Sequence, residues 1–120
     1  DVWGVAKIYE TYVGAKSFEP PEAIFQHIRD LGEEYGATTG RPRQCNWMDF
    51  DLLNKACKIN GVNKLVFNKM DILREVGVWK LFKDGQLIEF KEENEMKDWI
   101  RSNFSRERVE IFFSEDKNKI

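Results

Sequence analysis

The 120-residue sequence has little of what metal centres, disulfide scaffolds and membrane spans are built from. It contains one histidine and two cysteines, and no Cys/His metal-ligand spacing occurs in it. Two cysteines without a recognisable signal peptide indicate free thiols in a reducing cytosol, so we expect a cytoplasmic protein without a disulfide. The apolar runs are only of strand length, which excludes a membrane-spanning helix. The net charge of −2 excludes general affinity for nucleic acid or a membrane surface.

A phosphate-binding loop is also missing, since no Gly-x-x-Gly-Lys cluster occurs in the sequence. The chain starts at Asp1 rather than at a methionine, so we expect a piece of a longer protein, with a processed terminus as the alternative. Its content of 42% apolar and 13% aromatic residues is sufficient for one compact core. We therefore predict a single domain over residues 1–120.

The hydrophobic pattern predicts an α/β fold, with a mixed sheet, flanking helices and a β-hairpin. The near-continuous apolarity of the first strand indicates burial on both faces, as in a parallel sheet. Residues 10–21 are expected to form a loop, and the polar tail from Ser114 to Ile120 to be loose. The expected strands are Val2–Tyr9, Lys64–Phe67 and Arg108–Phe113, the hairpin joins Val76–Lys83 to Gln86–Phe90 around Asp84-Gly85, and the helices are Glu22–Leu31, Phe50–Asn60 and Asn94–Phe104.

Several single residues have an expected structural role. Asp49 is predicted to cap the second helix, whose apolar face would comprise Leu52, Leu53, Ala56, Cys57 and Ile59. Cys57 is then a small core residue rather than a reactive thiol. His27 has no partner histidine or cysteine, which favours a structural or surface role over catalysis.

The stretch from Glu33 to Arg43 is polar and has no apolar period. It combines two glycines, two threonines and two arginines, and arginine pairs bidentately with carboxylate or phosphate. This composition favours an anion-binding loop, and a solvated surface loop is the alternative. With unpaired arginines and few packing contacts, residues 35–46 are predicted to be mobile without ligand.

This stretch carries a family resemblance. The run from Gly32 to Arg43, followed by Trp47-Met48-Asp49, resembles the aspartate-binding loop of adenylosuccinate synthetases. Asn68-Lys69-Met70-Asp71 matches downstream at the spacing of that family, and Lys7-Ile8-Tyr9 and Val13-Gly14 match upstream. The resemblance spans about residues 2–73 and fades beyond Lys80. It implies that the chain is the C-terminal part of such an enzyme and a partial P-loop-NTPase-like ligase domain.

The resemblance also implies two sets of binding residues. Those for L-aspartate and IMP are Val13, Gly14, Thr38, Thr39, Gly40, Arg41 and Arg43; those for GTP are Arg43, Lys69, Asp71 and Ser114. Trp47 is expected to pack rather than to touch a ligand. The family pattern is interrupted in Lys16–Glu22, at Pro42, in Gln44-Cys45-Asn46, at Asn68 and after Ser114.

Asp71 has a specific chemical reason to bind guanine. One carboxylate can accept from both the N1–H and the exocyclic amino group of guanine, and adenine lacks this pair of donors. The stem of Lys69 can lie along the purine face while its ammonium stays solvated. The alternative makes Asp71 a residue at the start of a helix and Lys69 a solvent-facing side chain.

The implied enzyme joins L-aspartate to IMP with GTP and Mg²⁺, in AMP biosynthesis. The phosphate loop, the catalytic groups and the magnesium ligands of the family lie outside these residues, so no catalytic or metal-binding residue is assigned and the chain alone is expected to be inactive. A homodimer is one expectation for the full-length protein. The alternatives are a viral-type relative that ligates aspartate to a guanine deoxynucleotide, a non-catalytic guanine-nucleotide-binding module, and a fragment without ligand affinity.

Overall fold

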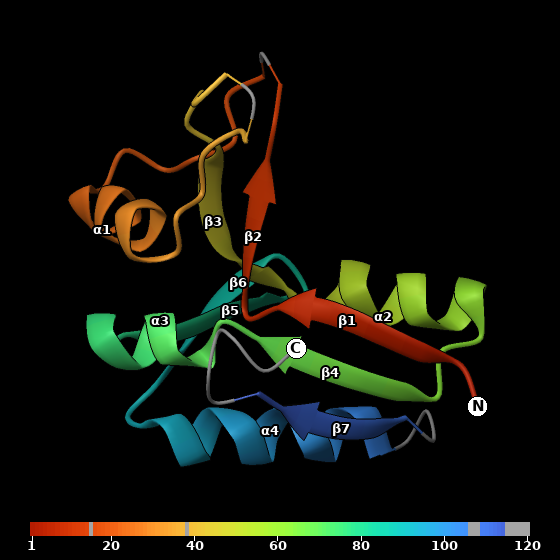
Figure 1. The fold of residues 1–120 in the computed structure, drawn as a ribbon. Coiled ribbons are helices and arrows are strands. Elements are labelled where there is room, and N and C mark those ends of the chain that lie inside the picture. Colours follow the sequence, from red (N-terminus) through yellow and green to blue (C-terminus); the bar gives the residue numbers. More distant parts are fainter. Residues whose placement is uncertain (15, 38, 106–108, 115–120) are drawn as a thin grey trace.

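The computed structural model describes residues 1–14, 16–37, 39–105 and 109–114 (Figure 1). The predicted α/β class is confirmed. The elements in chain order are β1 (Trp3–Lys7), β2 (Tyr9–Tyr12), α1 (Ala23–Leu31), β3 (Gln44–Asp49), α2 (Phe50–Asn60), β4 (Lys64–Asn68), α3 (Met70–Val76), β5 (Trp79–Lys83), β6 (Gln86–Phe90), α4 (Glu93–Ser105) and β7 (Glu110–Phe113).

The strands form two sheets rather than the single mixed sheet that we expected. One sheet has the order β1-β4-β7 and is entirely parallel. The other has the order β2-β3-β5-β6, in which only β3 and β5 are parallel. The chain passes from one sheet to the other at Ile8, where β1 ends and β2 leaves it at a steep angle (Figure 1).

Two expectations about local structure were wrong. Residues 9–12 were predicted to belong to a strand end and a loop, and they form β2 because their backbone pairs with Gln44–Trp47 of β3. Residues 44–46 were expected in the mobile loop. They are instead part of β3, because they pair with β2. Alternating polar and apolar residues at the edge of a sheet give a weak sequence signal, so only the tertiary pairing reveals these strands.

A single apolar core joins the two sheets to the helices. The rings of Phe50, at the start of α2, and Phe104, at the end of α4, lie 4.8 Å apart, and Phe50 meets Trp99 edge-on at 5.0 Å. Trp47 is 2% exposed and packs on Phe25 of α1, which confirms its packing role. Both thiols, Cys45 and Cys57, are buried, and Cys57 is a core residue as predicted.

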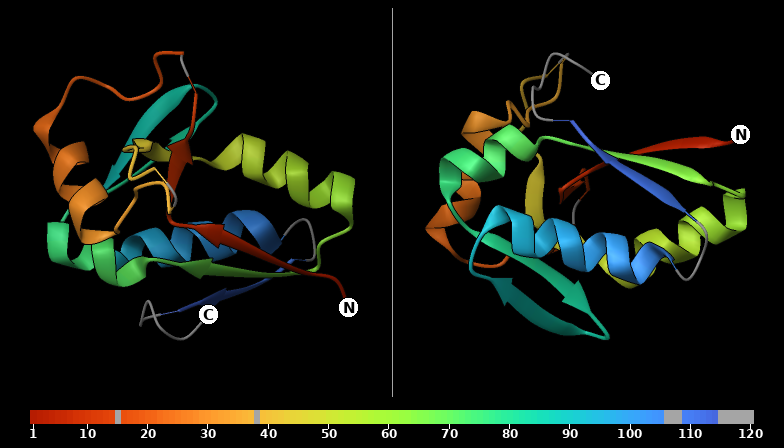
Figure 2. Two further views of the ribbon diagram at one scale, coloured as in Figure 1. Left: turned by 45° about the horizontal axis from the view of Figure 1, so that its top comes forward. Right: turned by 90° about the horizontal axis from the view of Figure 1, so that it is seen from below.

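Two apolar surfaces remain exposed, against expectation. The strand β1 was predicted to be buried on both faces, yet it is an edge strand, with Trp3 57% and Val5 58% exposed. Both α2 and α4 lie on one side of the parallel sheet, and the other side carries no helix among the described residues (Figure 2). On α2, Leu52 and Ile59 are exposed although the helical spacing assigned them to the buried face.

The predicted helix and hairpin boundaries are largely confirmed. Asp49 Oδ1 accepts from the N–H of Leu52 at 3.1 Å, and Gly61 ends α2 in the left-handed conformation, with φ of 66°. Asp84 and Gly85 both have positive φ, as a two-residue hairpin turn requires. The hairpin begins at Trp79, because Val76 is the last residue of α3.

Among the described residues, none of the helices combines the length and the apolar composition that crossing a bilayer requires. Arg108 and residues 115–120, which include most of the tail expected to be loose, lie outside the described residues.

The cap of α2 gives the first testable prediction. Replacing Asp49 by alanine leaves the N–H of Leu52 without its acceptor and should reduce the free energy of unfolding by about 1 kcal/mol. Asp49→Asn is the control, since asparagine caps nearly as well as aspartate. Urea denaturation followed by circular dichroism measures both variants; equal losses in the two would contradict a capping role.

Candidate functional site

The candidate residues fall into two groups: Lys69, Asp71 and Ser114 lie at the carboxyl-terminal edge of the parallel sheet, whereas Val13 and Gly14 follow β2 and residues 39–43 precede β3 in the second sheet. Because β1, β4 and β7 run in one direction, the residues that follow them meet at the same edge, where α/β sheets bind ligands (Figure 1). The N–H of Ser114 donates to the carbonyl of Phe67 at 2.8 Å, and that of Ile8 donates to Asn68 at 3.1 Å. Ser114 is therefore hydrogen-bonded to Phe67, the residue that immediately precedes the segment Asn68–Asp71.

Glu34 connects this edge to the polar loop. Its carboxylate is 1% exposed and accepts three hydrogen bonds: from Lys7 Nζ at 2.8 Å, from the hydroxyl of Tyr9 at 2.5 Å and from Arg43 Nη1 at 3.0 Å. The donors come from the end of β1, the start of β2 and the residue before β3. One buried charge thus joins three segments that are far apart in the sequence.

The protonation of this network follows from its contacts. Burial favours the neutral form of Glu34, but the hydrogen bonds from Lys7, Tyr9 and Arg43 outweigh it and hold the pKa of that carboxyl below its ordinary value. Burial, reinforced by the bond to Glu34, raises the pKa of Tyr9, so its hydroxyl stays a donor. Glu34 is therefore a carboxylate at neutral pH.

Gly32 lets this network meet the segment Asn68–Asp71. A Cβ at Gly32 would lie 2.2 Å from the Tyr9 hydroxyl, so only glycine fits beside it. Its carbonyl accepts from Lys69 Nζ at 3.3 Å. The Lys69 ammonium is thus held by the end of α1 rather than fully solvated as expected. The loop and the segment Asn68–Asp71 are connected through residues 32–34.

The polar loop, residues 35–43, contains more hydrogen bonds and ion pairs than the sequence predicted. Tyr35 pairs with Pro42, and the Gly36 N–H donates to the Arg41 carbonyl at 2.8 Å. Arg43, expected to be unpaired, forms an ion pair with Glu34, because its guanidinium reaches the buried carboxylate. Thr39, Gly40 and Arg41 are exposed. Thr38, also expected in the site, lies outside the described residues.

A second network fixes the loop that carries Val13 and Gly14. Gln44 accepts from the N–H groups of Phe18 and Glu19 at 2.8 and 3.0 Å and donates to the carbonyl of Lys16 at 2.7 Å. The buried guanidinium of Arg29 pairs with Glu19 at 2.5 Å. Val13, the residue after β2, is 68% exposed. These contacts hold the Val13–Gly14 turn beside the start of β3.

Asp71 lies in the first turn of α3 and lines a surface pocket of about 420 Å³ together with Arg74 and Glu75. Its Oδ1 atom is buried and has no hydrogen-bond partner among the described residues. Lys69, two residues before Asp71 and immediately before α3, has a φ of 64°, a left-handed conformation that is unusual for a residue with a side chain. The sharp turn at Lys69 directs the chain from β4 into α3.

Three residues of the Glu34 network had no expected role of their own. Lys7, Tyr9 and Glu34 were part of the matching motifs, but only the fold shows that their side chains meet. A signal existed in the sequence, because Lys7 interrupts an apolar strand at its carboxyl end. For a metal, no cluster of three or more His, Cys, Asp or Glu side chains occurs within the described residues, so none of them is assigned to magnesium.

Comparison with known proteins identifies the family of this chain. A family model described as adenylosuccinate synthetase matches residues 1–103, well beyond Lys80. The chain belongs to the adenylosuccinate synthetase family. It is 51% identical over 74 residues to the adenylosuccinate synthetase of Xanthomonas oryzae pv. oryzae (strain MAFF 311018), a match that covers 60% of this chain and 17% of that protein. It is 44% identical over 96 residues to the chloroplastic adenylosuccinate synthetase of Chlamydomonas reinhardtii, covering 73% and 20%.

Among solved structures, the chain resembles the fully ligated adenylosuccinate synthetase from Plasmodium falciparum, with a TM-score of 0.75 and 23% identity. The likeness covers 94% of this chain and 37% of that one, and at this identity it shows the fold. The chain spans about a fifth or less of the length of the curated synthetases that it matches. It therefore shares the family and the fold of these purine-biosynthesis ligases over a limited part of their length.

The Glu34 network predicts acid sensitivity. Because its pKa is lower in the folded protein than in the unfolded chain, Glu34 contributes stability above the ordinary value of 4.5 and loses it as the pH falls through the folded pKa. Glu34→Gln should reduce the free energy of unfolding at neutral pH by about 2 kcal/mol. The same substitution should also make the free energy of unfolding fall less steeply as the pH drops below 4.5.

Urea denaturation at several pH values measures this effect. The control is Glu89→Gln, which removes an exposed carboxylate on β6. A Glu34→Gln variant whose stability declines with acid as steeply as that of the wild type would contradict the assignment.

Proposed function

We propose that this chain supplies the L-aspartate-binding loop and the guanine-base subsite of an enzyme that joins L-aspartate to IMP using GTP. Val13, Gly14, Thr38, Thr39, Gly40, Arg41 and Arg43 would serve aspartate and IMP, and Arg43, Lys69, Asp71 and Ser114 would serve GTP. The observation that carries the proposal is the unpartnered, buried Oδ1 of Asp71 in a chain of this family. A buried carboxylate oxygen without a donor is unfavourable, and guanine offers two adjacent donors.

The bonding of Arg43 supports the aspartate part of the proposal. Only Nη1 of its guanidinium is used in a hydrogen bond within the described residues, and the side chain is 33% exposed. Glu34 thus fixes one edge of the guanidinium and leaves other N–H donors for a ligand carboxylate. The network has two cations around one carboxylate, so it retains a positive charge that attracts an anion.

These residues would bind and orient rather than react. Magnesium would supply charge neutralisation on the transferring phosphoryl group when bound, and the described residues hold no group that fits it. Arg43 would position the aspartate carboxylate, Asp71 would select guanine, and the Gly32–Glu34 segment would keep the two at a fixed separation. The phosphate-binding and catalytic groups would have to come from other residues of the enzyme.

A transplant tests this assignment. Replacing the matching segment of the Xanthomonas oryzae synthetase by this chain should preserve formation of adenylosuccinate from IMP, GTP, L-aspartate and Mg²⁺. The 120-residue chain alone should form none, because it lacks a phosphate loop. The wild-type Xanthomonas enzyme is the control. A folded chimera without aspartate-dependent turnover, or an active isolated chain, would contradict the proposal.

Asp71 provides the sharpest test of base recognition. In Asp71→Asn, an amide donor faces the exocyclic amino group of guanine, which should weaken the use of GTP by about 1–3 kcal/mol. Xanthine has a carbonyl at that position and can accept from the new amide, so XTP should become the better donor. Turnover of the chimera with GTP and XTP measures the ratio, with Glu75→Gln in the same pocket as the control.

If Asp71 served only to start α3, asparagine would replace it with little change, and the ratio of GTP to XTP use would stay as in the wild type. That result would remove Asp71 from the site. It would also favour the alternative hypothesis, in which this chain does not recognise guanine.

A further inference from the structure

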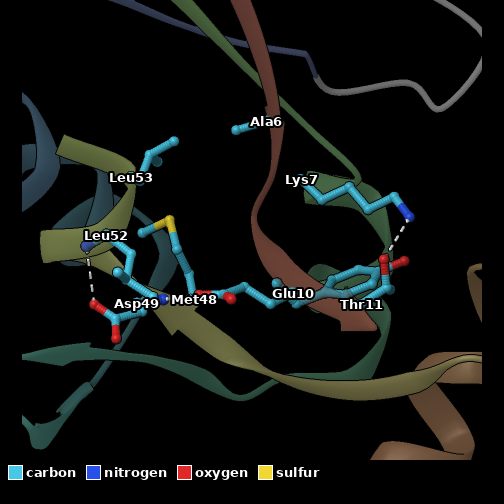
Figure 3. Close-up of a pocket in the computed structure, with 9 residues that line it drawn as sticks. Ala6, Lys7, Glu10, Thr11, Met48, Asp49, Leu52 and Leu53 are labelled. Carbon is cyan, nitrogen blue, oxygen red and sulfur yellow. Dashed lines mark hydrogen bonds between the residues drawn. The ribbon is translucent and has the colours of Figure 1, made fainter. Parts of the chain in front are cut away.

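A separate cavity of about 320 Å³ lies between the junction of β1 with β2 and the first turn of α2. Figure 3 shows two kinds of side chain around it. Met48, Leu52 and Leu53 form an apolar wall, and the carboxylates of Glu10 and Asp49 lie beside that wall. None of these five residues belongs to the nucleotide or aspartate assignments above.

The two carboxylates lack a cation. One oxygen of Glu10 accepts from the backbone N–H of Asp49, and Oδ1 of Asp49 accepts from the N–H of Leu52 at 3.1 Å. No ion pair of either side chain occurs among the described residues. Burial raises the pKa of Glu10. The hydrogen bond from the backbone of Asp49 lowers this pKa, the negative charge of Asp49 raises it further, and the net shift is upward. A neighbouring positive charge would relieve both costs.

This arrangement differs from that of the other half-buried and buried glutamates. Glu19 pairs with Arg29 at 2.5 Å, Glu34 with Lys7 at 2.8 Å and Glu93 with Arg74 at 2.6 Å. Lys7 also lines the cavity, but its ammonium is directed away from Glu10, to Glu34 and to the hydroxyl of Thr11 at 3.2 Å (Figure 3). The cavity therefore presents uncompensated negative charge next to exposed apolar surface, and Leu52 is 61% exposed.

We propose that this cavity binds a guanidinium or ammonium group carried on an aliphatic stem, with the cation on Glu10 and Asp49 and the stem against Met48, Leu52 and Leu53. This is the chemistry of an arginine or lysine side chain of another polypeptide segment, or of a free alkyl cation. Charge-assisted hydrogen bonds hold the head group, and burial of the stem adds the hydrophobic contribution. The site does not depend on the proposed ligase function.

Other ligand classes fit less well. An anion in this cavity would face the carboxylates of Glu10 and Asp49, and the ammonium of Lys7 is directed away from them, to Glu34 and Thr11. A divalent metal ion prefers more oxygen ligands than these two side chains offer, and the described residues contain no larger donor cluster here.

The test is a titration of the 120-residue chain with butylguanidinium, followed by isothermal calorimetry and by amide chemical shifts. Saturable binding is expected, with shifts at Glu10, Asp49 and Leu52. Glu10→Gln and Asp49→Asn should each weaken binding by about tenfold, the loss of one charged acceptor. Both keep the backbone hydrogen bonds of the originals. Glu89→Gln, which removes an exposed charge on β6, should bind as the wild type does.

Ligand controls keep the proposal testable even if a variant unfolds. Butyrate, with the same stem and the opposite charge, should not bind, and guanidinium without a stem should bind more weakly than butylguanidinium. N-acetyl-arginine amide presents the same group on a peptide backbone: tighter binding than butylguanidinium indicates a polypeptide source, and weaker binding indicates a free alkyl cation. The proposal is overturned if butylguanidinium gives no saturable binding, if butyrate binds equally, or if both carboxylate variants bind as the wild type does.

Discussion

The buried carboxylate of Glu34 is the constraint on which the rest of this site depends. A charge that is 1% exposed must be satisfied from within the protein, and the donors come from Lys7, Tyr9 and Arg43. These requirements fix where β1 ends, where β2 begins and how the polar loop enters β3. Gly32 belongs to the same constraint, because any larger residue would displace the Tyr9 hydroxyl. The candidate aspartate loop is therefore built outward from one buried ion cluster.

The departures from the family pattern fit together in the same way. The unusual segment from Lys16 to Glu22 and the unusual Gln44 are in contact, since Gln44 binds the backbone at Lys16, Phe18 and Glu19. The carboxylate of Glu19 also accepts from the N–H of Cys45 at 2.9 Å. The two segments that depart from the family pattern therefore contact each other, and Gln44 also donates to the carbonyl of Gly14 at 3.4 Å, which holds the turn after β2 beside β3.

Much of the fold could be predicted from sequence, and the failures have a common cause. Helix α2 and the hairpin at Asp84 were predictable because their caps and turns are local signals. Strand β2 and the pairing of Arg43 were missed because both depend on distant partners, β3 and Glu34. The exposure of β1 was missed because an apolar run indicates burial without saying what covers it. The motifs located the candidate site, and the fold supplied the contacts between them.

We expect Glu34 to couple the loop to the segment Asn68–Asp71 through Gly32. Hydrogen–deuterium exchange of the wild type and of Glu34→Gln tests it most directly. In Glu34→Gln, we expect faster exchange in residues 35–43 and, together with them, in Lys69–Asp71, while the amides of α4 keep their protection. Faster exchange confined to the loop, or unchanged exchange in both segments, would contradict the coupling.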